Sequence, residues 1–254
     1  MRKLLLGLLV AFLVTVPISA APKDAYLGDV AVVSWLDRDT VMVVLANESP
    51  HGAAVTISTN IWDSRWRPVF TERTVTVPGR SIVQEAFVLN TSWKNEPLSI
   101  RVSQRNNAIT VDVQMPTIFQ PSAYVVRANE QIEVGVDLAF LLERQEQARL
   151  IVDDFAQVYG ANSREPIKVK SVEGGFRYVS SRNSIEYVPP WMVLSTKTPQ
   201  LNGTGVITFS LYKETDGYRG YRDEIPGPTI LVYGRNLRFA ESSKEPTLPR
   251  IITR

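Results

Sequence analysis

The chain has 254 residues, 44% of them hydrophobic, with 28 basic and 26 acidic side chains. It contains no cysteine, so a disulfide framework is excluded and stability has to come from the burial of apolar surface. This length suits one large or two ordinary domains, and the near balance of charges gives no global attraction for nucleic acid.

The first 20 residues have the pattern of a cleavable secretory signal peptide. Arg2 and Lys3 precede an apolar run at 4–16, and a proline and small residues precede an expected cut after Ala20. The run is shorter than the roughly 20 residues that a membrane-spanning helix needs. Cleavage removes two basic and no acidic residues, so the formal net charge falls from +2 to zero. We expect export to the periplasm, cell surface or extracellular space, with no integral membrane segment after cleavage and no nucleic-acid partner.

From residue 29 onward, apolar and polar side chains alternate in short runs that end at polar turns. This period of two is typical of strands with one buried face, and the turn at 104–107 is expected to close a tight hairpin. The predicted strands cover residues 30–36, 40–45, 54–61, 74–77, 81–89, 98–103 and 108–113. About seven strands in ~90 residues are the spacing of an immunoglobulin-like sandwich. We therefore predict such a domain over residues 22–115.

Prolines mark the end of this unit. Pro116 and Pro121 interrupt the alternation, and a proline cannot donate a hydrogen bond to a central ladder. We therefore predict a second immunoglobulin-like sandwich over residues 116–238. The polar stretch 239–254 is predicted to be a disordered tail.

Residues 141–157 fit two interpretations. Clean alternation just before them favours a hairpin that turns through 144–147. Helix propensity and a possible cap at Gly160 favour a helix instead, with one stripe formed by Leu138, Leu141, Ala148, Val152 and Phe155. Later strands are predicted at 167–172, 175–180, 185–188, 191–195, 205–212 and 229–233. The predicted fold is mostly β, with two immunoglobulin-like β-sandwich domains in tandem and a helix near 141–157 left open.

Residues 40–63 resemble elements of the periplasmic pilus chaperones. One predicted strand there ends in Asn47-Glu48-Ser49, and the next ends in Ile61-Trp62-Asp63. This resemblance implies an immunoglobulin-like fold and an assembly chaperone that lends a strand to an unfinished subunit.

Residues 173–235 resemble the BACON-type immunoglobulin-like repeats of bacterial surface proteins. The similar segments are Glu173-Gly174-Gly175, residues 191–195, residues 203–210 and Arg219-Gly220. This resemblance implies glycan binding, or a role as a spacer between other domains.

The residues for most kinds of catalysis are missing from the sequence. His51 is the only histidine, so no multi-histidine metal site can form, and no phosphate loop or nucleophile elbow occurs. The acid pairs or groups are Asp153 with Asp154, Asp37 with Asp39, and Asp216 with Asp223 and Glu224. The last two supply fewer oxygens than the six to eight that calcium takes. We expect no metal, no cofactor and no enzymatic activity.

Two segments, 212–222 and 61–68, interleave aromatic with basic side chains, a combination enriched in binding hot spots. The first is predicted to form a long exposed loop. Trp62 and Trp191 are expected in the cores. The candidate binding residues are Tyr212, Tyr218, Arg219, Tyr221, Arg222, Trp66 and Arg67.

Three functional hypotheses follow. The first is a non-enzymatic exported protein that binds a protein or glycan partner at the cell envelope. The second is a pilus-type assembly chaperone acting by strand donation, which requires a long exposed edge strand at 108–115 or at 54–61. The third is a carboxylate-based glycan hydrolase that uses Asp153 and Asp154.

Overall fold

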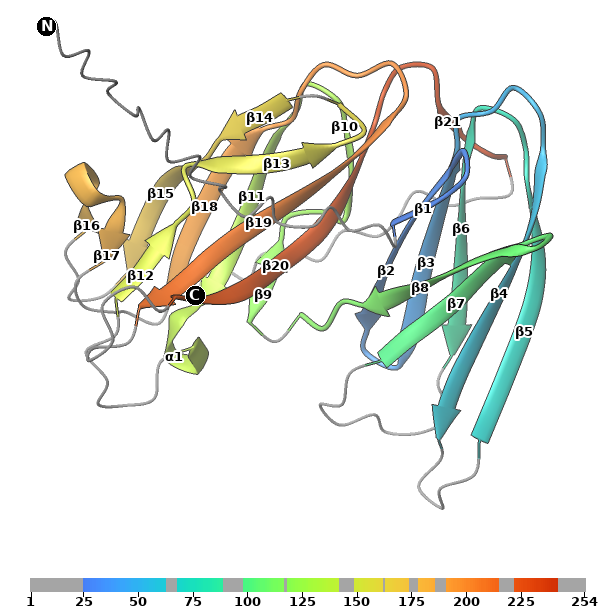
Figure 1. Cartoon of the computed structure of the whole chain (residues 1–254), viewed down its shortest axis with the longest axis horizontal. Helices are drawn as coiled ribbons and strands as arrows, with labels where there is room; N and C mark the ends of the chain where they lie inside the picture. Colours follow the sequence, from blue (N-terminus) through green and yellow to red (C-terminus); the bar gives the residue numbers. More distant parts are fainter. Residues whose placement is uncertain are drawn as a thin grey trace, which may run out of the picture.

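The computed structural model describes residues 25–62, 68–88, 98–116, 118–141, 149–161, 163–173, 178–185, 191–214 and 222–241. It confirms a mostly β chain, which forms two sandwiches side by side (Figure 1). The predicted signal peptide and residues 242–254 of the predicted tail lie outside the described residues. Within those described, no helix is long and apolar enough to cross a membrane.

The first sandwich packs a five-stranded sheet against a four-stranded sheet. The five-stranded sheet has the order β1 (Tyr26–Leu27), β2 (Val30–Asp37), β3 (Thr40–Asn47), β6 (Ser81–Val88) and β21 (Arg238–Phe239). The four-stranded sheet has the order β5 (Pro68–Val77), β4 (Ala53–Trp62), β7 (Leu98–Gln104) and β8 (Asn107–Val113). The strands predicted for this region all form, although β5 begins earlier than predicted.

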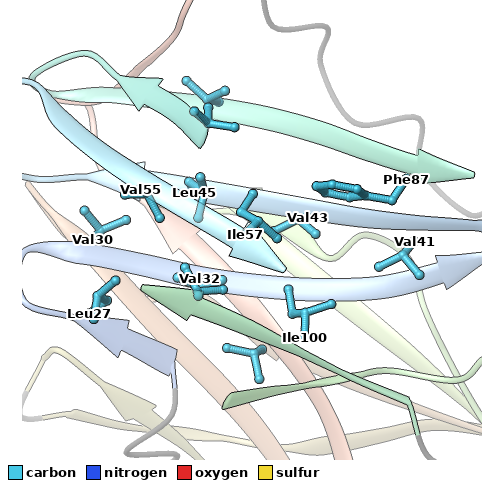
Figure 2. Close-up of a cluster of buried hydrophobic side chains, with 14 of the residues drawn as sticks. Leu27, Val30, Val32, Val41, Val43, Leu45, Val55, Ile57, Phe87 and Ile100 are labelled. Carbon is cyan, nitrogen blue, oxygen red and sulfur yellow. The ribbon is translucent and has the colours of Figure 1, made fainter. Parts of the chain in front are cut away.

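Alternation along the strands builds the core between these two sheets. Val41, Val43 and Leu45 of β3 are fully buried, and Figure 2 shows them facing Ile57 of β4 and Ile100 of β7. Burying an aliphatic side chain of this size contributes about 1.5–3 kcal/mol. A chain without disulfides is held together by such clusters.

The predicted tight hairpin at 104–107 is confirmed. Gln104 pairs with Asn107 across a two-residue turn, and Arg105 in that turn has a φ of 52°. A positive φ at this position matches the turn to the twist of the flanking strands. The turn therefore fixes the register of β8 against β7.

The second sandwich packs an eight-stranded sheet against a four-stranded one. The larger sheet contains β10 (Val125–Arg127), β20 (Arg222–Tyr233), β19 (Thr204–Glu214), β12 (Arg149–Val152), β17 (Ser184–Ile185), β16 (Tyr178–Val179), β13 (Phe155–Tyr159) and β14 (Ser163–Pro166). The smaller sheet has the order β15 (Lys168–Glu173), β18 (Trp191–Lys197), β11 (Gln131–Asp137) and β9 (Phe119–Pro121). Short helical turns lie at α1 (Leu138–Leu141) and η2 (Ser180–Arg182).

The helical interpretation is wrong for the described part of residues 141–157. Of these residues only Leu141, the last residue of α1, is helical, and residues 149–152 and 155–159 instead form β12 and β13, which both pair with β19. Leu150, Val152, Ala156 and Val158 are buried because pairing with β19 turns alternate side chains toward the core. Tertiary pairing therefore overrides the helix propensity of this stretch. The predicted turn at 144–147 lies outside the described residues.

The end of the described chain returns to the first sandwich. The predicted boundary between the second sandwich and the disordered tail falls between Arg238 and Phe239. In the structure both residues instead form β21, which pairs in parallel with Ser81 and Ile82 of β6. Figure 1 shows the chain crossing from β20 to β21. The two sandwiches are thus joined by this crossing as well as by the segment between β8 and β9.

Candidate functional site

β8 is the outermost strand of its sheet, and no described strand lies beyond it. It pairs with β7 along its whole length. Val111 and Val113 are buried in the core, Ile109 packs against it, and Ala108 and Thr110 are exposed. The outer side of β8 is therefore a sheet edge along which no described strand forms a ladder with β8, although β1 and β2 of the facing sheet contact this strand.

The hairpin turn determines which backbone groups of β8 point away from β7. Gln104 and Asn107 flank a two-residue turn and form a hydrogen-bonded pair, so every second residue from Asn107 bonds to β7. The intervening residues direct their N–H and C=O groups outward, and these are Ala108, Thr110 and Asp112.

Gln114 continues this outward series and confirms its direction. Its N–H donates to the carbonyl oxygen of Ser34 at 3.1 Å, and its carbonyl accepts from the N–H of Leu36 at 3.0 Å. The hydroxyl of Ser34 also donates to the carbonyl oxygen of Asp112 at 3.2 Å. The edge is thus closed by β2 at its far end and remains open at Ala108 and Thr110 among the described residues.

A cleft of about 300 Å³ lies where this edge meets the second sandwich. Its walls come from β2, from β8 with the segment that follows it, and from the middle of β20. The lining is mostly apolar and consists of Ala25, Val32, Val33, Val111, Asp112, Gln114, Met115, Phe119, Tyr124, Pro226, Gly227, Pro228 and Thr229. The cleft therefore continues the open edge of β8 toward β20.

The side chain of Gln114 joins the two walls of the cleft. Its amide nitrogen donates to the carbonyl oxygen of Thr229 at 2.8 Å, and its amide oxygen accepts from the N–H of Thr229 at 2.8 Å. The side-chain amide thus pairs with β20 as a neighbouring strand residue would. Because its backbone pairs with β2, Gln114 ties both sandwiches to one point.

An aromatic pair packs beside this contact. Trp35 of the first sandwich and Tyr124 of the second stack with ring centroids 4.9 Å apart and ring planes 11° apart. Both side chains belong to a buried cluster that draws on both sandwiches, together with Val33, Val206 and Leu231. Burial raises the pKa of Tyr124 above its ordinary value because it disfavours the charged phenolate.

A polar contact holds the opposite side of the joint. The carboxylate of Glu48 accepts hydrogen bonds from the backbone N–H of Thr204, at 2.7 Å, and from the Thr204 hydroxyl. Tyr26 lies nearby, and its hydroxyl donates to the carbonyl oxygen of Tyr159 at 3.4 Å. Burial is the main cause that raises the pKa of Tyr26 to about 12. The two sandwiches are thus held together by a second contact, away from Gln114.

Most binding residues predicted from the sequence cannot be placed. Tyr218, Arg219, Tyr221, Trp66 and Arg67 lie outside the described residues. Tyr212 is half-buried in β19, and the backbone of Arg222 begins β20 opposite Glu214. The segment 215–221 therefore connects the ends of a two-stranded ribbon.

The chaperone hypothesis requires an exposed edge strand at one of two stretches, and the structure excludes one of them. The stretch 54–61 lies within β4, which pairs with β5 on one side and β7 on the other, so it is not an edge. The stretch 108–113 is the edge strand β8. Trp191, expected in the core, is half-buried and packs against Gly135, and the side chain of Trp62 is outside the described set.

Among the described residues, no group of three histidine, cysteine or acidic side chains is placed so that it could hold a metal ion. Asp153 and Asp154 lie in the connection between β12 and β13. Burial raises the pKa of Asp153, while Asp154 accepts a hydrogen bond from Asn183 at 2.7 Å. Asp37 and Asp39 flank and occupy the exposed turn between β2 and β3.

No protein-family model and no curated protein matches this chain. Among solved structures it is similar to red sea bream transglutaminase, at 12% identity over 83% of this chain and 32% of that one, with a TM-score of 0.27. It is also similar to the native conformation of E. coli alpha-2-macroglobulin (10% identity, 81% and 17% coverage, TM-score 0.28). A third is the Yersinia pseudotuberculosis adhesin InvE (13% identity, 80% and 58% coverage, TM-score 0.22). The chain covers less than two thirds of each of these proteins.

Proposed function

We propose that this is a non-catalytic, exported protein of the cell envelope that binds an extended segment of a partner protein as an additional strand on β8. The observation that carries the proposal is the outward direction of the backbone groups of Ala108 and Thr110, which have no hydrogen-bonded outer strand in the described chain. Strand addition gives affinity through such main-chain hydrogen bonds. Export rests on the signal peptide that the sequence predicts.

The side chains of β8 leave its edge unprotected. Natural edge strands commonly carry lysine, proline or a bulge that prevents pairing with other chains. At Ala108 and Thr110, where its edge is open, β8 carries neither a charged side chain nor a proline. By contrast the edge strand β15 of the second sandwich presents Lys168 and Lys170 at exposed positions and has a register shift near Val169. The difference favours β8 as the edge kept open for a partner.

A proline substitution at the edge tests this proposal. Thr110→Pro removes one outward N–H that has no described partner and places a ring where the added strand would lie, without removing a bond to β7. We expect the protein to fold, because proline is tolerated on an edge strand where its N–H would face outward, and we expect at least a ~10-fold loss of partner affinity. Thr110→Ala, the matched control, should bind normally.

The partner is to be captured in its own envelope by a photo-crosslinking residue at position 108, and its affinity measured with the purified pair. Crosslinks that map to an extended segment of one envelope protein, and that disappear in Thr110→Pro, support strand addition. Undiminished affinity of a folded Thr110→Pro variant would sink it. The assembly-chaperone form of the proposal requires in addition that the captured partner is a sandwich lacking one strand.

A second candidate site is the segment 215–221. β19 and β20 pair as far as Glu214 and Arg222, so the segment with Tyr218 and Tyr221 connects the ends of a paired ribbon, and such connections often carry binding residues. Changing both tyrosines to alanine tests this site for a protein or glycan partner. Loss of binding with unchanged thermal stability favours the segment, and retained binding excludes it.

A further inference from the structure

We propose that the cleft beside β8 receives a basic side chain, arginine or lysine, from the strand that pairs with this edge. This inference rests on the proposed strand addition and specifies the partner's chemistry. An added strand that pairs along Ala108 and Thr110 reaches Asp112, where the cleft begins. A side chain at that end of the strand therefore enters the cleft.

The charge of the cleft lining favours a ligand side chain of the opposite charge. Asp112 is the one charged side chain among the described residues that line it, and it is exposed at the rim. Within the described chain its carboxylate has no ion pair or hydrogen bond, in contrast to Glu85 and Glu133, which pair with Arg73 and Lys170 at 2.6 Å. An acidic side chain entering here would meet a like charge and no described cation.

The remaining lining suits the stem of such a side chain. Val32, Val111, Met115 and Pro228 offer apolar contacts, and long basic side chains bury their aliphatic stems while their charged ends stay near water. A volume of about 300 Å³ is at the lower end of the range for small-ligand pockets. The cleft is thus large enough for one side chain and too small for a second domain.

Tyr124 supplies a second polar group. It is 2% exposed, lines the cleft, and its hydroxyl has no hydrogen-bond partner in the described chain. The stack on Trp35 holds its ring in place. The amide of Gln114 is already used by Thr229, which leaves the phenol oxygen as an acceptor for a guanidinium or ammonium donor. A purely apolar side chain would leave both Asp112 and Tyr124 unpartnered.

The test is selection of binding peptides from a phage library of random dodecapeptides, panned against the purified full-length secreted protein. We expect enriched peptides to be β-forming and to share an arginine or lysine at one fixed position. Selected peptides should bind Asp112→Asn ~10-fold more weakly. Glu130→Gln, which removes one exposed charge away from the cleft, is the matched control and should bind like wild type.

The same selection separates failure of this inference from failure of the proposed function. Two results overturn the cleft assignment but remain compatible with strand addition. In both, the enriched peptides lose binding to Thr110→Pro. In the first they share no basic position, and in the second they bind Asp112→Asn as tightly as wild type. Peptides that are insensitive to Thr110→Pro, or a library that yields no enriched sequence, count against both. Replacing the basic position of an enriched peptide with glutamate should abolish its binding.

Discussion

Gln114 gives the sharpest test of how the walls of the cleft are held. Its side-chain amide makes two hydrogen bonds, both 2.8 Å long, to the backbone N–H and C=O of Thr229. Gln114→Ala removes both bonds and leaves two half-buried backbone groups of Thr229 without these partners. A typical intramolecular hydrogen bond contributes about 1 kcal/mol net. We therefore expect Gln114→Ala to lower the free energy of unfolding by about 2 kcal/mol.

Urea denaturation followed by circular dichroism measures this loss, and thermal unfolding gives a second reading. For a chain of this size each kcal/mol lowers Tm by roughly 2–4 °C, so the expected shift is about 4–8 °C. Gln104→Ala is the matched control, because the side chain of Gln104 makes no hydrogen bond in the described chain, and it should stay within about 0.5 kcal/mol of wild type. A Gln114→Ala protein as stable as Gln104→Ala would refute the assignment of Gln114 as the tie between the sandwiches.

Two further predictions concern packing and pH. Gly79→Ala should destabilise the protein by about 1–3 kcal/mol in urea titrations, because a Cβ there would lie 2.1 Å from the carbonyl oxygen of Pro50. Gly52→Ala, where the nearest atom would be 3.7 Å away, is the control, and equal stabilities would contradict the reasoning. The pKa of Tyr26 is raised to about 12 from 10.0, so its contribution to stability is complete below pH 10 and is lost as the pH rises toward 12. Unfolding measured across this window should show a decline that is smaller in Tyr26→Phe, and identical pH profiles would argue against it.

Much of the fold follows from local signals in the sequence. Short polar turns separate runs of alternating side chains throughout residues 30–113, so local preference and tertiary pairing agree there. Residues 149–159 were ambiguous because their apolar side chains fit a helical stripe as well as an alternating strand. Only the pairing with β19, which is distant in the sequence, decides between the two.

The cleft was not predictable in the same way. Its walls meet through residues as far apart as Val32, Gln114 and Thr229, and nothing local in a lone glutamine indicates that its amide pairs with another strand. Pro226 and Pro228 could have suggested an edge in this part of β20, since prolines are confined to strand edges. The binding residues predicted from the sequence stand out by their composition, since aromatic and basic side chains alternate there. The open edge of β8 depends instead on the direction of its backbone groups, which composition does not encode.

Residue-resolved amide hydrogen exchange along β8 tests the central claim most directly. In the free protein the amides of Ala108 and Thr110 should exchange rapidly, while those of Ile109 and Val111, bonded to β7, should exchange slowly. In complex with the partner segment, the amides of Ala108 and Thr110 should become protected and the alternation should disappear. Amides of Ala108 and Thr110 that are already protected in the free protein, or that remain unprotected in a saturated complex, would contradict strand addition at this edge.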